Sequence, residues 1–187
     1  MIHRSRLFTH LTFFLACIGG CASLPYSSDY PLQPGYLLSS DGALRYRVPV
    51  GWFDAQDDAR MHNAVIWLVR NDYASTISIS EVHLDSAAKT NLQAEGLLKL
   101  ASLTLSLSAG EQSANVLRPP QRFTTNGMEW CAYELITAST RDTLRVVLAR
   151  TDSRLYDITA LVSGGHDGVL CHEVFSVQQR VLESLKW

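Results

Sequence analysis

The order of strand-like and helix-like segments along the chain limits it to a narrow set of folds. Three segments with strand character come first, then a long helical pattern, then four more strand segments and a final helical pattern. Strands grouped in this way pair antiparallel, whereas alternating strands and helices would build a parallel sheet. The order therefore predicts an α+β fold with one antiparallel sheet and two helices.

Hydrophobic periodicity identifies the first group of strands. Residues 43–48 alternate apolar and charged side chains, as a half-buried strand does, and a Pro-Val-Gly-Trp turn at residues 49–52 ends the strand. Residues 64–69 are continuously apolar, which is typical of a central strand covered on both faces. Residues 76–82 alternate again and predict a third strand with its isoleucines buried.

A long helix is expected between the two groups of strands, at residues 86–108. Its stripe, at spacings of three and four, is Leu92, Gly96, Leu100, Leu103 and Leu107. Gly96 weakens the middle of this helix by about 1 kcal/mol. The alternation of residues 103–108 also fits a strand, but the good helix formers before it favour a helix.

Four strands and a second helix are expected after this point. The strands cover residues 116–124, 128–139, 143–151 and 155–162. Pro119 and Pro120 confine the first of them to a sheet edge, and Asn126-Gly127 predicts a tight hairpin after it. The closing helix spans residues 169–185, with Asp167 as its N-cap. Its expected buried stripe is Leu170, Val174, Val177, Val181 and Leu185.

A basic cluster, an apolar run and small residues occupy the N-terminus. Arg4 and Arg6 precede the apolar run, which ends in Gly19-Gly20-Cys21. This order is typical of a cleaved export signal, because the 14 residues from 7 to 20 are fewer than the roughly 20 that span a membrane. The Gly-Gly-Cys ending resembles the bacterial lipoprotein box, in which the cysteine receives diacylglycerol and becomes the new N-terminus.

This resemblance implies a signal peptide at residues 1–20 and lipidation of Cys21. A plain secretory signal, cleaved at another site, is the alternative, since small residues recur at Ala22 and Ser23. By the same resemblance, Ala22 in place of Asp implies sorting to the outer membrane, on its periplasmic face. We expect the covalent lipid alone to hold the protein at the membrane. A polybasic patch that binds lipid headgroups is not expected, because the chain has only the lysines Lys89, Lys99 and Lys186.

Processing at Cys21 would leave 167 residues with a formal net charge of −4, since Arg4 and Arg6 leave with the signal. That length suits one domain with a substantial core. The mild acidity argues against a nucleic-acid partner, which needs a concentrated basic surface. Residues 21–42, interrupted by prolines, predict an extended tether that contacts the domain from Tyr36 onward, and residues 43–187 form the domain.

The segment Tyr46-x-Val48-Pro49-x-Gly51-Trp52, with the order of elements around it, resembles the PsbP fold family. That family includes the extrinsic protein of photosystem II, a Ran-binding nuclear relative and DcrB-type bacterial lipoproteins. The resemblance implies a curved antiparallel sheet of about six to seven strands, flanked by a long central helix and a C-terminal helix. It also implies docking rather than catalysis, with no cofactor and no shared active site.

Two clusters of metal-ligating residue types do not have the spacing of known sites. The first is His166, Asp167, His172 and Glu173, and the second is Asp54, Asp57, Asp58 and His62. The six-residue step between the histidines departs from zinc motifs, and the second cluster lacks the Gly and terminal Glu of a calcium loop. No serine stands in Gly-x-Ser-x-Gly. We therefore expect a helix cap and a solvated loop rather than metal sites or an enzyme.

Two cysteines remain after Cys17 is assigned to the signal and Cys21 to the lipid. Cys131 and Cys171 are an even pair, and an oxidising compartment favours a disulfide between them. The alternative is two small buried hydrophobic side chains. We hypothesise a disulfide that pins the final helix to the sheet.

Two functions from different classes fit the sequence. The first is a lipid-tethered docking module in the envelope, with Trp52 and Phe53 as candidate partner contacts; the alternative for Trp52 is a place in the core. The second is a binder of a small apolar ligand, or a lipoprotein chaperone, with a cavity lined by the leucines of residues 92–107. A cavity above about 300 Å³ favours the second function, and a filled core favours docking.

Overall fold

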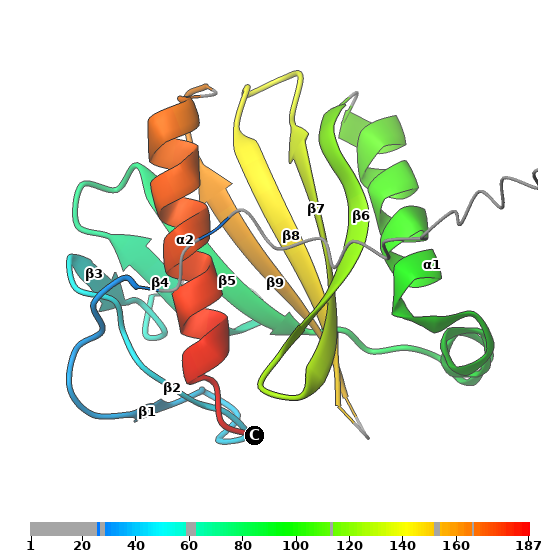
Figure 1. Ribbon diagram of the computed structural model, residues 1–187, viewed down its shortest axis with the longest axis horizontal. Helices are drawn as coiled ribbons and strands as arrows, with labels where there is room; N and C mark the ends of the chain where they lie inside the picture. The colour runs from blue at the N-terminus through cyan, green and yellow to red at the C-terminus, as the bar shows by residue number, and fades with distance from the viewer. Residues whose placement is uncertain (1–25, 27–28, 59–62, 113, 152–153, 166) are drawn as a thin grey trace, which may run out of the picture.

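Two helices lie on opposite sides of a seven-stranded antiparallel sheet (Figure 1). The computed structural model describes residues 26, 29–58, 63–112, 114–151, 154–165 and 167–187. The elements in chain order are β1 (Leu37–Leu38), β2 (Arg45–Tyr46), β3 (Trp52–Asp54), β4 (Ala64–Arg70), β5 (Ser75–Glu81), α1 (Ser86–Gln112), β6 (Asn115–Thr125), β7 (Met128–Ile136), β8 (Thr143–Arg150), β9 (Leu155–Val162) and α2 (Gly168–Ser184).

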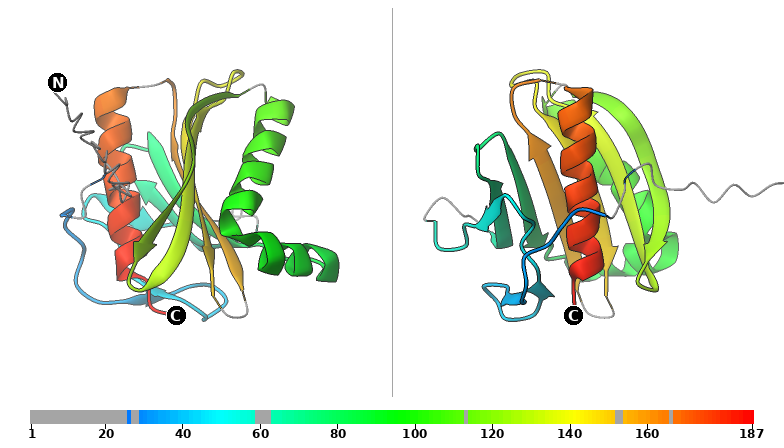
Figure 2. Two further views of the ribbon diagram at one scale, coloured as in Figure 1. Left: turned by 45° about the vertical axis from the view of Figure 1, so that its right-hand side comes forward. Right: turned by 60° about the vertical axis from the view of Figure 1, so that its left-hand side comes forward.

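The strand order in the large sheet is β3-β4-β5-β9-β8-β7-β6, and every neighbouring pair is antiparallel. Figure 2 shows the twist and curvature of this sheet between the two helices. The predicted α+β class, the curved antiparallel sheet and the two flanking helices are confirmed.

Strand alternation divides the core into two layers. On β7, Trp130 and Ala132 face α2, whereas Cys131 and Tyr133 face α1. Successive side chains of a strand point to opposite faces, so one sequence supplies both layers. The layer under α2 is the larger and also takes in Trp52 from the edge of the sheet.

The helix α2 agrees with its sequence pattern. The Asp167 carboxylate accepts hydrogen bonds from the backbone N–H groups of Val169 at 2.9 Å and Leu170 at 3.3 Å, which satisfies two donors at the helix start. The predicted stripe members Val174, Val177, Val181 and Leu185 are buried, and Leu170 is half-buried. Each buried valine stabilises the fold by about 1.5–3 kcal/mol relative to an exposed one.

The helix α1 is bent at Gly96, and this bend corrects the predicted apolar stripe. Gly96 has φ 78° and ψ 175°, which no helical residue adopts, so residues 86–95 and 97–112 form two arms (Figure 2). The buried positions are Leu92, Leu97, Ala101 and Leu105. Leu103 and Leu107, predicted to be buried, are 50% and 63% exposed, because the bend rotates the second arm away from the register of the first.

Three short strands and one burial pattern differ from the prediction. The strand predicted at residues 43–48 is reduced to β2, two residues that pair with β1 outside the seven-stranded sheet. β1 and β3 are two and three residues long, too short for any periodicity to show. Residues 64–69 were expected to be covered on both faces, but β4 lies next to the edge strand β3 and its Trp67 is only half-buried. The predicted edge strand with Pro119 is confirmed: β6 ends the sheet and its pairing slips around Arg118.

The segment before β1 contacts the domain earlier than predicted. Tyr26 and Tyr30 are half-buried against the core, and Leu32 forms an isolated bridge with Pro49. The backbone N–H of Gln33 donates to the Val48 carbonyl at 2.8 Å. Within the described residues, contact is therefore already present at Tyr26, before the predicted Tyr36, and the blue segment crosses α2 in Figure 2.

Candidate functional site

The second arm of α1 covers only part of its face of the sheet. Its main packing partners are β6, β7 and β8. The same face of β4, β5 and β9 lies beyond this cover, as Figure 2 shows, and we call it the open face. Among the described residues, α1 packs on β6, β7 and β8 and leaves this face of β4, β5 and β9 without a helix over it.

The side chains change character where the helix cover ends. Tyr133 of β7 pairs with Val146 of β8, and both are buried beneath α1. The next two partners in the row are Thr159 of β9 and Ser78 of β5, both half-buried. The row therefore changes from apolar to hydroxyl side chains at the limit of the helix.

The adjacent row repeats the change. Leu148 of β8 is buried under α1, and its neighbours across the sheet are Asp157 of β9 and Ser80 of β5. The pKa of Asp157 is raised above its ordinary value, because burial outweighs the hydrogen bond that the Thr159 hydroxyl donates to this carboxylate at 2.7 Å. The open face is therefore a surface of hydrogen-bonding groups set on a rigid sheet.

Two hollows meet at the end of β5. Residues 81–83 separate them, and we call this segment the ridge. The hollow over the open face has a volume of about 900 Å³. Besides the ridge, its lining is Asp41, Asn63, Val65, Ser78, Ser80, Asp157 and Thr159.

The second hollow lies between the ridge, the first arm of α1 and the start of β9, and has a volume of about 510 Å³. Its lining includes the cations Lys89, Arg150 and Arg154 against the single carboxylate of Glu81. Lys89 and Arg150 are exposed. We call it the cationic hollow.

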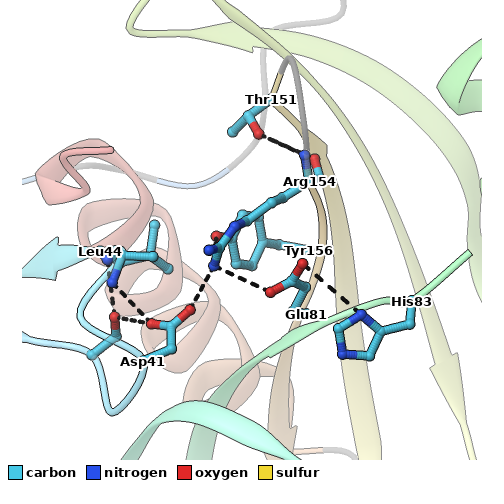
Figure 3. Close-up of polar contacts among 9 residues, drawn as sticks. Asp41, Leu44, Glu81, His83, Thr151, Arg154 and Tyr156 are labelled. Carbon is cyan, nitrogen blue, oxygen red and sulfur yellow. Dashed lines mark hydrogen bonds and ion pairs between the residues drawn. The ribbon is translucent and has the colours of Figure 1, made fainter.

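Arg154 holds the ridge in place (Figure 3). Its guanidinium lies 2.7 Å from the Asp41 carboxylate and 3.2 Å from that of Glu81. The imidazole of His83 lies 4.0 Å from the other Glu81 oxygen, and its side chain is 87% exposed. One cation thus joins the loop before β2, the end of β5 and the start of β9.

The loop around Asp41 positions this carboxylate toward Arg154. The Ser39 hydroxyl donates to Asp41 at 2.5 Å, and the backbone N–H of Ala43 donates at 3.1 Å. Burial alone would raise the pKa of Asp41, but these hydrogen bonds and the charge of Arg154 lower it below its ordinary value. Asp41 is therefore a fixed anion that orients Arg154.

These side chains can recognise a polar ligand. The hydroxyls, carboxylates and guanidinium can donate and accept hydrogen bonds along an extended ligand. Within the described part of the chain, no group of three or more His, Cys, Asp or Glu could hold a metal ion. In that same part, no helix is long and apolar enough to cross a bilayer.

The predicted partner contacts Trp52 and Phe53 have different environments. Trp52 is 2% exposed and belongs to the core, so its assignment as a contact is wrong and the core alternative holds. Phe53 is 36% exposed and packs edge to face against Tyr73, with ring centroids 5.8 Å apart. Alternation along β3 explains the difference, because neighbouring side chains point to opposite faces.

The structure corrects the predicted disulfide between Cys131 and Cys171. Both residues are buried thiols. Cys131 shares its strand face with Tyr133 and Leu135, as predicted, but that face packs under α1, whereas Cys171 lies on α2 across the sheet. Burial raises the pKa of both thiols, that of Cys131 to about 11, so both are weak nucleophiles.

The other candidate residues have structural roles or lie outside the described chain. Asp167 caps α2, and Asp54 accepts a hydrogen bond from the Tyr46 hydroxyl at 2.8 Å. His62, His166 and the lipidation candidate Cys21 lie outside the described residues. The sequence pattern missed Asp41, Glu81 and Arg154, because no local motif joins positions so far apart.

The interface between α1 and the sheet does not favour the predicted apolar cavity. Leu97, Ala101 and Leu105 pack there against Tyr133 and other buried side chains. The cationic hollow lies between the first arm of α1 and the sheet and exceeds the volume of about 300 Å³ expected of a ligand binder. From residues 92–107, however, the two hollows take only Leu92 and Gln93.

No protein-family model and no curated protein sequence matches the chain. The solution structure of cyanobacterial PsbP (CyanoP) from Synechocystis matches with a TM-score of 0.53 and 14% identity, over 90% of this chain and 98% of that one. The Ran-binding protein Mog1p of Saccharomyces cerevisiae matches with a TM-score of 0.56 and 13% identity, over 84% and 95%. These likenesses show that the chain has the predicted PsbP-like fold.

Proposed function

We propose that this PsbP-like chain is a non-catalytic docking module of the cell envelope, which binds a protein partner on its open face. The observation that carries the proposal is the change from apolar to hydroxyl side chains where α1 ends, with two hollows beside it. Two hollows with charged side chains between them are features of a surface that binds a partner rather than one that contacts only solvent.

The sheet edges support binding on a face rather than by strand addition. β3 offers only three residues, and β6 carries Pro119 and Pro120, which donate no backbone hydrogen bond. A partner strand would find a short edge at one side and an interrupted edge at the other.

Charge indicates the chemistry of the partner segment. Arg154 is already paired with two carboxylates, whereas Lys89 and Arg150 add two further cations at the mouth of the cationic hollow. The mature chain as a whole is acidic, so this local excess of positive charge fits an acidic segment of a protein partner. Mog1p, a Ran-binding protein by name, is a case of this fold in which the partner is a protein.

The anchor of the module is the proposed lipid on Cys21, with the mature protein held at the periplasmic face of the outer membrane. Replacement Cys21→Ser should abolish the acyl mass and release the protein from membranes, since the several chains of a lipoprotein hold it by about 0.8 kcal/mol per buried methylene. Intact-mass measurement of the wild-type protein without any acyl mass would contradict the anchor.

Site-specific photocrosslinking in cells tests the docking face. A photoreactive amino acid at Ser80 or Thr159 should give a protein adduct, whereas the same group at Ser139, in the exposed turn after β7, should give none. The adduct should disappear in the double variant Lys89→Glu/Arg150→Glu. Equal adducts from Ser139, or none from either open-face position, would contradict docking there.

A further inference from the structure

Tyr26 is inserted into the domain just after the proposed lipid site. Its ring lies 4.8 Å from the guanidinium carbon of Arg145 and packs edge to face against Phe175, with centroids 5.5 Å apart. The ring centroid of His172 on α2 lies 5.6 Å from that of Tyr26. The tyrosine thus fills the space between α2 and the strands on the far side of the sheet from the open face.

The Tyr26 hydroxyl also joins a buried network. It donates to the Glu134 carboxylate at 2.5 Å, and that carboxylate pairs with Arg118 at 3.1 Å. Arg145 is fully buried and donates to the side-chain oxygens of Gln178 at 2.7 Å and Gln179 at 3.2 Å. A side chain held by ring contacts and a charged hydrogen bond is fixed in position.

Cys21 and Tyr26 are five residues apart. A fully extended chain spans at most about 3.5 Å per residue, so the lipidated atom lies within about 18 Å of the Tyr26 position. If the chain first contacted the domain at Tyr36, the free tether from Cys21 would be 15 residues long and would reach about three times as far.

We propose that Tyr26 is a latch that holds the domain against the phospholipid surface by its α2 side and directs the open face away from it. The proposal rests on the lipidation in the proposed function. The membrane-facing surface is bounded by β6 and the start of α2.

Exposed side chains on that surface fit a phospholipid bilayer. Val169, at the start of α2, is 80% exposed, and Leu117 of the edge strand β6 is 38% exposed. Arg118 of the same strand lies on the Tyr26 side of the sheet, where its side chain is 47% exposed and pairs with Glu134. Apolar and arginine side chains together suit the boundary between acyl chains and phosphates.

Fluorescence quenching in vesicles tests the orientation. A fluorophore is attached to Val169→Cys or to His83→Cys on the ridge of the lipidated full chain, since Cys131 and Cys171 are buried and Cys21 carries lipid. The vesicles are phosphatidylcholine with a fraction of spin-labelled lipid. We expect several-fold stronger quenching at position 169 than at position 83.

Two variants test the latch itself. Tyr26→Ala should make quenching at the two positions nearly equal, whereas Tyr36→Ala, on a ring that is 43% exposed, should leave the difference intact. Insertion of ten Gly and Ser residues after Ser23 leaves every described residue unchanged and should reduce quenching at position 169, because it lengthens the reach of the anchor.

The outcomes separate the latch from the anchor. Protein that floats with the vesicles but shows equal quenching at positions 169 and 83 would overturn the latch alone. Protein that does not float would overturn the anchor in the proposed function, and the latch with it. An unchanged difference in both Tyr26→Ala and the lengthened tether would also overturn the latch.

Discussion

At the residue scale, the buried cation Arg145 organises the polar part of the larger core. Burial lowers the pKa of Arg145 to about 10, against the opposite influence of Tyr26 and Glu134. Its guanidinium donates to the side-chain oxygens of Gln178 and Gln179, whereas the Glu134 carboxylate pairs with Arg118. Such a network is stable only while every member is satisfied.

Replacement Tyr26→Phe should lower the free energy of unfolding by about 1–2 kcal/mol. The variant keeps the ring contacts but removes the hydrogen bond to the charged Glu134, and bonds to charged groups are worth about 1.5–3 kcal/mol. Urea denaturation of the mature chain measures the change. The matched control Tyr36→Phe alters an exposed ring and should cost far less; equal costs would contradict a role for the Tyr26 hydroxyl.

Asp41 should make the stability of the ridge depend on pH. Its pKa in the folded state lies below the ordinary value of 3.8, so its contribution is present above about pH 4 and lost as the pH falls through the folded pKa. Asp41→Asn should therefore cost about 1 kcal/mol at pH 7 and progressively less as the pH falls through the folded-state pKa of Asp41. Denaturation curves of both proteins across this range measure it, and a difference independent of pH would contradict the ion pair.

The cysteines show what residue patterns can and cannot give. Alternation correctly placed Cys131 on one face with Tyr133 and Leu135. No local pattern says which helix covers that face, because the choice depends on the connection between distant elements. The predicted disulfide was wrong because α1, and not α2, covers the face that carries Cys131.

At the element scale, Gly96 decides how much of the sheet is covered. Its backbone conformation is open to glycine almost alone, and it lets the first arm of α1 leave the sheet. The first arm then forms one wall of the cationic hollow through Lys89, Leu92 and Gln93. One residue thus determines both the limit of the open face and the hollow beside it.

Replacement Gly96→Ala should destabilise the fold by about 1–3 kcal/mol, because a non-glycine residue is strained in this conformation. Its added methyl group would also lie 3.4 Å from the guanidinium of Arg122. Gly110→Ala is the matched control: it lies in the same helix with nothing near its new methyl group, and should be neutral or stabilising by up to about 1 kcal/mol. Thermal melts that rank the two variants the other way would contradict the bend.

The two helices differ in how well their sequences predicted them. α2 has an unbroken stripe with a capping aspartate, and its bounds and most of its buried positions were predicted. For α1 the periodicity predicted a helix but not its bend, since a glycine inside a helical pattern is compatible with a straight helix. The misassigned Leu103 and Leu107 follow from that one ambiguity.

At the scale of the whole molecule, the two sides of the sheet have different tasks. The α2 side carries the larger core and receives the N-terminal segment through Tyr26. The α1 side offers the open face and the two hollows. Anchoring and docking would thus take place on opposite sides and would not compete for surface.

The candidate site could not be predicted from the sequence, although most of the sheet could. Most of the longer strands were recognisable from alternation or from a continuous apolar run, whereas β3 is too short to show either. Asp41, Glu81 and Arg154 come together because β5 pairs with β9, a partnership between strands with a helix and three strands between them in sequence. Such proximity follows from the strand order, and the strand order has no local signal.

The most direct test of docking on the open face is the dissociation constant of the partner recovered by crosslinking. It should be measured for the wild-type protein, for Thr159→Arg on the open face and for Ser139→Arg in the turn after β7, after melts show that all three fold. We predict that Thr159→Arg weakens binding about tenfold or more, a loss of about 1.4 kcal/mol, while Ser139→Arg binds as the wild type does. Equal affinities of all three proteins would contradict a partner on the open face.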